Sequence, residues 1–196
     1  MISLEIVGEA PSAVEVGDQA PGFEGLLGVD GQRYGLSTFA DKPVLVLIFA
    51  SNRCPTVKAY EGRLRHLQED YAGSGVQLVA VNSNDPHLYP EESYERMVEF
   101  ARESGYAFPY LLDGEQRTAR AYGVTRTFHL FLLDASRRVR YQGRFDDSRI
   151  PARVTTDDLR NALVDVLSDR PVRVPATRPF GCSLDYVGPG IAGART

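Results

Sequence analysis

One cysteine stands where a thiol could be reactive. Cys54 follows a run of seven apolar residues, 44–50, and precedes Pro55. The apolar run is rich in β-branched residues and predicts a strand that is buried on both faces. Pro55 suits the first position of a helix, which makes Cys54 the expected N-cap. Unpaired backbone N–H groups and the helix dipole favour a thiolate there, and the thiolate is the nucleophilic form of cysteine.

The helix N-terminus alone would ionise Cys54 only in part. Such a position stabilises a negative charge by about 0.3 to 1 kcal/mol, and by up to roughly 2 kcal/mol when it is partly buried. Because about 1.4 kcal/mol corresponds to one pKa unit, a cysteine pKa of about 8.5 would fall to roughly 7 to 8. A nearby cation would lower the pKa further, and solvent must reach the sulfur. The simplest alternative is that Cys54 is a small buried residue of the core.

The elements that would hold this cysteine alternate between strands and helices. Apolar residues at helical spacing predict a helix over 55–71, and Asp30-Gly31 between two short strand-like runs predicts an N-terminal β-hairpin. Further buried strands are expected over 76–81 and 128–133. Further helices are expected from Pro90, over 115–122 and from Thr155. These elements predict an α/β fold, a central mixed β-sheet with helices on both faces.

The chain of 196 residues is expected to form a single domain, 1–196, with a core over about 16–168. Residues 1–17 should lie on the surface. From Pro171 onward prolines and glycines recur, which predicts an extended arm over 171–196. This arm carries Cys182, the second of the two cysteines.

Composition narrows the class of partner. The net charge is −4 and no basic run occurs, which argues against nucleic acid or an anionic membrane as a partner. No apolar run reaches the roughly 18 residues of a membrane span, and no signal peptide is evident. Two cysteines are not a disulfide scaffold, so the cytoplasm is the expected location. The histidines lack ligand spacing, and we expect no metal and no other cofactor.

In α/β folds, sites lie at the carboxyl ends of the strands. Three loops are expected to meet there: 51–54, 82–85 and 125–128. The residues expected to bind substrate at this edge are Ser51, Asn52, Pro55, Thr127 and Phe128.

Six short motifs over residues 16 to 186 share a pattern with known proteins. They are Val16–Phe23, Ser51–Pro55, Val81–Asp85, Ala119–Gly123, Gly143–Asp147 and Gly181–Ser183. Together they resemble the thioredoxin-fold peroxiredoxins, the alkyl hydroperoxide reductase/thiol-specific antioxidant family. They are most similar to its peroxiredoxin-like thioredoxin-family branch. The resemblance implies a thioredoxin-like sandwich and a thiol-based redox activity.

The chain departs from that family at three positions. Val57 occupies the place of the second cysteine of a C-x-x-C motif, so no disulfide can form within the motif. Ser51 stands where peroxiredoxins have a threonine. Thr127 is followed by Phe128 instead of the family's cis-proline, and a non-proline cis bond costs about 3 to 4 kcal/mol. We therefore expect a trans bond and a loop of altered shape.

The resemblance implies that the Cys54 thiolate reacts with a peroxide or a disulfide, as an antioxidant enzyme or thiol oxidoreductase. A second thiol must then resolve the adduct. Cys182 would serve if the arm lies over the helix start, in its own subunit or in a partner, and an external thiol reductant would serve otherwise. Arg126 is the expected cation beside the thiolate, with Arg53 as the alternative.

A second function stays open. The missing second cysteine and Phe128 also fit a redox-inactive thioredoxin-fold binding module that docks partners through its arm. Relatives of this kind often pair, so a homodimer is also left open.

Overall fold

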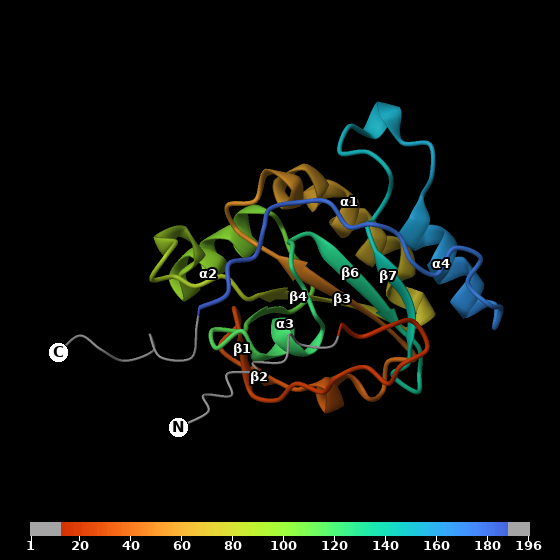
Figure 1. The fold of residues 1–196 in the computed structure, drawn as a ribbon, viewed down its shortest axis with the longest axis horizontal. Coiled ribbons are helices and arrows are strands. Elements are labelled where there is room, and N and C mark those ends of the chain that lie inside the picture. Colours follow the sequence, from red (N-terminus) through yellow and green to blue (C-terminus); the bar gives the residue numbers. More distant parts are fainter. Residues whose placement is uncertain (1–12, 188–196) are drawn as a thin grey trace, which may run out of the picture.

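The computed structural model describes residues 13–187, so the expectations for residues 1–12 and for the end of the arm, 188–196, lie outside it. A seven-stranded sheet has the order β2-β1-β5-β4-β3-β6-β7 (Figure 1). The strands are β1 (Leu26–Gly28), β2 (Arg33–Tyr34), β3 (Val44–Ala50), β4 (Val76–Asn82), β5 (Tyr110–Leu112), β6 (His129–Leu133) and β7 (Val139–Gly143). The α-helices are α1 (Pro55–Tyr71), α2 (Tyr94–Glu103), α3 (Arg117–Ala121) and α4 (Asp158–Leu167).

The pairing of the strands brings three loops to one edge of the sheet. Strand β3 pairs in parallel with β4 and antiparallel with β6. The carboxyl ends of β3 and β4 and the first residue of β6 therefore lie together, as expected for loops 51–54, 82–85 and 125–128. The sheet is mixed, and β1 and β2 form the expected hairpin around Asp30-Gly31.

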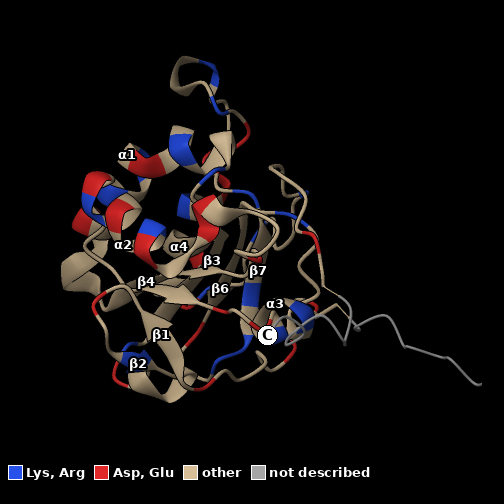
Figure 2. Cartoon of the chain, turned by 90° about the vertical axis from the view of Figure 1, so that its left-hand side faces the viewer, with Lys and Arg blue, Asp and Glu red and all other residues tan. Residues whose placement is uncertain are grey.

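Helices cover both faces of the sheet. Successive side chains of β3 point to opposite faces of the sheet, and both sets are apolar, so both faces must be covered. Val46 and Ile48 belong to one core cluster, and Leu45 and Leu47 belong to the other. Helices α1, α2 and α4 pack on the first face, and α3 packs on the second together with the segment before β3. Acidic and basic residues are interspersed on the outer surface of α1 and α2 (Figure 2). Within residues 13–187 no helix is both long and apolar enough to cross a membrane.

The arm crosses the molecule in extended form, as predicted (Figure 1). It first runs beside β7, where the backbone of Gln142 bonds to Pro175 and Thr177. It then passes the loop before β6, where Leu184 N–H donates to Thr125 O over 3.0 Å. The buried Leu184 side chain anchors this part of the arm in the core.

Three local expectations were wrong. Val14, in the segment 1–17 that was expected on the surface, is buried in the second core cluster. Pro90 begins a short 3-10 turn, Pro90–Glu92, and α2 starts only after Ser93, whose hydroxyl caps it. The Thr127–Phe128 peptide bond is cis. The trans bond expected from the local preference is therefore not found, and the Phe128 ring is buried 4.9 Å from that of Tyr60.

Candidate thiol site

Cys54 lies at the junction of β3 and α1 and is the N-cap of α1, with Pro55 at the first helical position, as the sequence predicted. Its exposed fraction is 0%. The expectation that solvent reaches the sulfur was therefore wrong. The arm residues Phe180 and Cys182 pack against the core cluster that contains Cys54.

Cys182 lies against Cys54, although the two are far apart in the sequence. The Thr127 N–H group donates to the Cys182 carbonyl oxygen over 2.9 Å, and Arg126 forms an antiparallel bridge with Ser183. Gly181 lies so close to this loop that a Cβ atom there would be 1.6 Å from the Thr127 carbonyl oxygen. The loop before β6 thus fixes the arm so that both thiols meet, and both are free.

The two thiols differ in acidity. Burial raises the pKa of Cys54, but the Cys182 thiol, the Val57 N–H group and the Thr127 hydroxyl stabilise its thiolate by hydrogen bonding. The net effect lowers the Cys54 pKa below its ordinary value. Burial and the adjacent Cys54 raise the pKa of Cys182 to about 11. Cys54 is therefore the first of the two thiols to ionise as the pH rises.

A buried carboxylate holds the segment that leads into Cys54. Glu92 is 0% exposed and accepts hydrogen bonds from the Ser51 hydroxyl, from the Asn52 N–H group over 2.8 Å and from the Asn82 side chain over 2.9 Å. The Arg53 side chain lies 3.8 Å from the same carboxylate. These contacts tie the turn from Pro90 to the end of β3 and fix the position of the loop before the thiol.

Ser51 and Asn52 were expected to bind substrate, but the structure gives them an internal role. Both are buried, and the Asn52 side chain also accepts from the Tyr110 hydroxyl over 2.9 Å and donates to Glu91 O over 2.8 Å. The polar groups of both side chains are thus occupied by hydrogen bonds within the protein. Among the other residues expected to bind substrate, Thr127 is buried beside the two thiols, Phe128 is part of the core and Pro55 is exposed.

Neither arginine proposed from the sequence is among the main influences on the Cys54 pKa. The Arg126 guanidinium instead donates to the Gly181 carbonyl oxygen over 3.2 Å. The Arg53 guanidinium lies 3.4 Å from the centre of the Tyr89 ring, and the Tyr89 hydroxyl donates to Asp185 of the arm. The cation expected beside the thiolate is thus replaced by hydrogen-bond donors, and Arg53 helps to hold the arm.

A family comparison decides what kind of protein this is. The model of the Redoxin family matches residues 15–163, which is most of the chain and includes Cys54, Glu92 and Thr127. The chain belongs to the Redoxin family.

Known proteins similar to this Redoxin-family chain agree with its fold. It is 28% identical, over 79% of its length and 80% of the other, to the thiol-disulfide oxidoreductase ResA of Geobacillus thermodenitrificans. A hypothetical protein from Sinorhizobium meliloti has a solved structure with a TM-score of 0.83 and 37% identity, covering 90% of this chain and 97% of that one. A putative thiol:disulfide interchange protein DsbE from Chlorobium tepidum gives a TM-score of 0.65 at 25% identity, covering 79% and 99%. The fold is an α/β thioredoxin-like fold.

Sequence reasoning missed Glu92 as a member of this Redoxin-family site. The residue was placed at the start of a helix, where a carboxylate is ordinarily exposed. No local signal marks it, because its hydrogen bonds go to Ser51 and Asn52, about 40 positions earlier. Within residues 13–187 no group of three or more His, Cys, Asp or Glu residues is arranged to hold a metal ion.

Proposed function

We propose that this Redoxin-family protein is a thiol-disulfide oxidoreductase in which Cys54 is the nucleophile and Cys182 the resolving thiol. The observation that carries the proposal is the Cys182 thiol lying against an N-cap cysteine, with the pKa of Cys54 lowered and that of Cys182 raised. The relationship to thiol-disulfide oxidoreductases supports the same activity.

The first step is attack by the Cys54 thiolate on one sulfur of a substrate disulfide. The substrate S–S bond breaks, a bond forms between Cys54 Sγ and that sulfur, and the other substrate sulfur leaves as a thiolate that takes a proton from solvent. Because Cys54 is fully buried, the arm over it must be displaced locally before the disulfide can reach the sulfur.

The second step closes the bond between the two cysteines. Cys182 loses its proton and attacks Cys54 Sγ, which releases the remaining substrate sulfur as a thiol. The substrate disulfide has then gained two electrons from the protein and two protons, one from Cys182 and one from solvent, and the protein holds a Cys54–Cys182 disulfide. An external thiol reductant restores the dithiol.

A disulfide substrate fits the site better than a peroxide. Peroxide reduction is expected to use a cation at the thiolate, and Arg126 bonds to Gly181 instead of acting on Cys54. A pair of adjacent thiols of unequal acidity suits thiol–disulfide exchange, because one ionises readily to attack the substrate and the other can resolve the mixed disulfide.

Mass spectrometry of the protein after brief treatment with 2-hydroxyethyl disulfide tests the proposal. We expect a Cys54–Cys182 crosslink that returns to two free thiols on reduction. In the Cys182→Ser variant the reaction should stop at a mixed disulfide on Cys54. In the Cys54→Ser variant the fast reaction should be lost.

The opposite pattern supports a redox-inactive binding module. In that case Cys54 would react no faster than an unperturbed thiol, and no crosslink between the two cysteines would form. A crosslink formed with hydrogen peroxide but not with the disulfide would assign the protein to peroxide reduction.

A further inference from the structure

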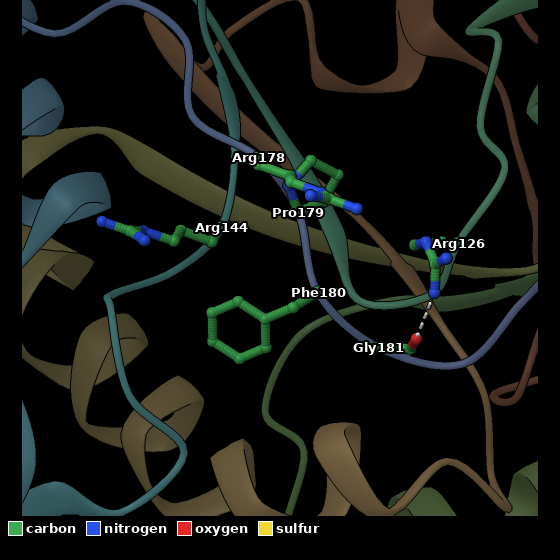
Figure 3. A pocket seen from close by; sticks show the side chains of 6 residues that line it. All are labelled: Arg126, Arg144, Arg178, Pro179, Phe180 and Gly181. Carbon is green, nitrogen blue, oxygen red and sulfur yellow. Dashed lines mark hydrogen bonds between the residues drawn. The ribbon is translucent and has the colours of Figure 1, made fainter.

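A pocket of about 370 Å³ opens beside the two thiols. Three arginines and three consecutive residues of the arm form its walls (Figure 3): Arg126, Arg144, Arg178, Pro179, Phe180 and Gly181. Two of these residues are chain neighbours of the thiol site, because Arg126 directly precedes Thr127 and Gly181 directly precedes Cys182.

The arginines of this pocket are not equivalent. Arg144 extends away from the other two and is paired with Asp158, with 2.7 Å between Arg144 Nε and Asp158 Oδ2 (Figure 3). The Arg178 side chain extends toward Arg126 (Figure 3). Both are exposed, and within residues 13–187 neither forms an ion pair with a carboxylate. Two guanidinium groups that share a pocket without a counter-ion favour an anionic ligand between them.

The proposed function limits which anion is useful at this place. A ligand held between Arg126 and Arg178 lies within a few residues of Cys182, which is partly exposed whereas Cys54 is fully buried. Cys182 is therefore the sulfur of a Cys54–Cys182 disulfide that a reductant can reach. The pocket is too small for a folded partner and suits a small molecule.

We propose that Arg126 and Arg178 bind the carboxylate of a low-molecular-mass thiol that reduces the Cys54–Cys182 disulfide. This inference rests on the proposed function. Phe180 supplies an apolar wall for the carbon chain of the ligand, and the planar guanidinium groups suit a carboxylate because they can form paired hydrogen bonds.

The exchange balances with two molecules of the small thiol. The first, as its thiolate, attacks Cys182 Sγ, the Cys54–Cys182 bond breaks, and Cys54 leaves as a thiolate. Cys54 is the better leaving group because the pKa of its thiol is the lower one. The second thiol attacks the sulfur of the first and releases Cys182 with a proton. The protein dithiol is restored, and the two small molecules leave as their disulfide.

Equilibrium binding to the full-length reduced protein tests the pocket without any reaction. The probes are 3-(methylthio)propionate and its neutral amide, followed by the NMR signal of the Gly181 N–H group. We expect the carboxylate to bind more tightly than the amide. The affinity for the carboxylate should fall about fivefold in Arg178→Gln, and this fall should be smaller at high salt. Arg178→Lys should keep part of the affinity. Arg149→Gln, which removes an exposed arginine outside the pocket, should leave it unchanged.

Reduction kinetics of the oxidised protein test the second half of the inference. With 3-mercaptopropionate the rate should fall about fivefold in Arg178→Gln, whereas with the neutral 2-mercaptoethanol it should not change.

Equal affinity for the carboxylate and the amide, or binding of inorganic phosphate in place of the carboxylate, would overturn the proposal. A protein that never forms the Cys54–Cys182 disulfide would overturn the proposed function, and the binding experiment would still decide the carboxylate site.

Discussion

The pKa of Cys54 is lowered by hydrogen-bond donors instead of by a cation. Its burial alone would raise the pKa of the thiol, and the opposite outcome depends on the Cys182 thiol, the Val57 N–H group and the Thr127 hydroxyl. The helix start could be recognised in the sequence, because Pro55 follows Cys54. The donors from Thr127 and Cys182 could not be recognised in the sequence, since they come from the loop before β6 and from the arm.

Replacing Thr127 by valine tests this account at a single atom. The substitution removes the hydroxyl and keeps the shape of the side chain, so the Cys54 pKa should rise by up to about one unit. Because a higher thiol pKa leaves less thiolate at neutral pH, thiolate absorbance near pH 7 should decrease. Thr127→Ser keeps a hydroxyl and is the matched control. An unchanged titration in Thr127→Val would show that the hydroxyl does not act on Cys54.

At the scale of elements, the site depends on the junction of β3, α1 and the turn Pro90–Glu92. The strand and the helix on either side of Cys54 were predicted with the bounds that the structure shows. Their signals are local, a continuous apolar run and a helical repeat. The turn could not be predicted, because its role comes from contacts of Glu92 with residues about 40 positions earlier.

Glu92→Gln is expected to disturb this junction. An amide nitrogen would face groups that now donate to the carboxylate, and a buried hydrogen bond to a charged group contributes about 1.5 to 3 kcal/mol. We expect the free energy of unfolding, measured in urea, to fall by about 2 kcal/mol or more, and the rate of Cys54 alkylation to change. Glu91→Gln, next to it and exposed, is the control. Equal stability of the two variants would contradict the role given to Glu92.

At the scale of the whole molecule, the arm completes the thiol site. The sequence indicated an extended arm from Pro171, and the structure shows it lying across β7 and the loop before β6. What the sequence could not give was its path. That path depends on individual packing contacts, such as the close approach of Gly181 to the Thr127 carbonyl and the burial of Leu184 in the core.

Gly181→Ala is expected to lift the arm from the site. A Cβ atom there would overlap the Thr127 carbonyl oxygen, and overpacking of this kind costs about 1 to 3 kcal/mol. The displaced arm should expose Cys54, so its reaction with an aromatic disulfide reagent should be at least about fivefold faster. The Cys54–Cys182 crosslink should form more slowly. Gly62→Ala, where the added Cβ meets no atom within 4 Å, should behave as wild type.

The central claim is that two adjacent thiols ionise in a fixed order. The direct test is alkylation of the wild-type protein across a range of pH, with the rates at Cys54 and Cys182 followed separately by mass spectrometry of their peptides. We predict that the Cys54 rate rises with a midpoint below the ordinary pKa of a cysteine thiol, and that the Cys182 rate rises near pH 11. A Cys54 midpoint at or above that ordinary pKa, or a Cys182 midpoint below that of Cys54, would contradict the account.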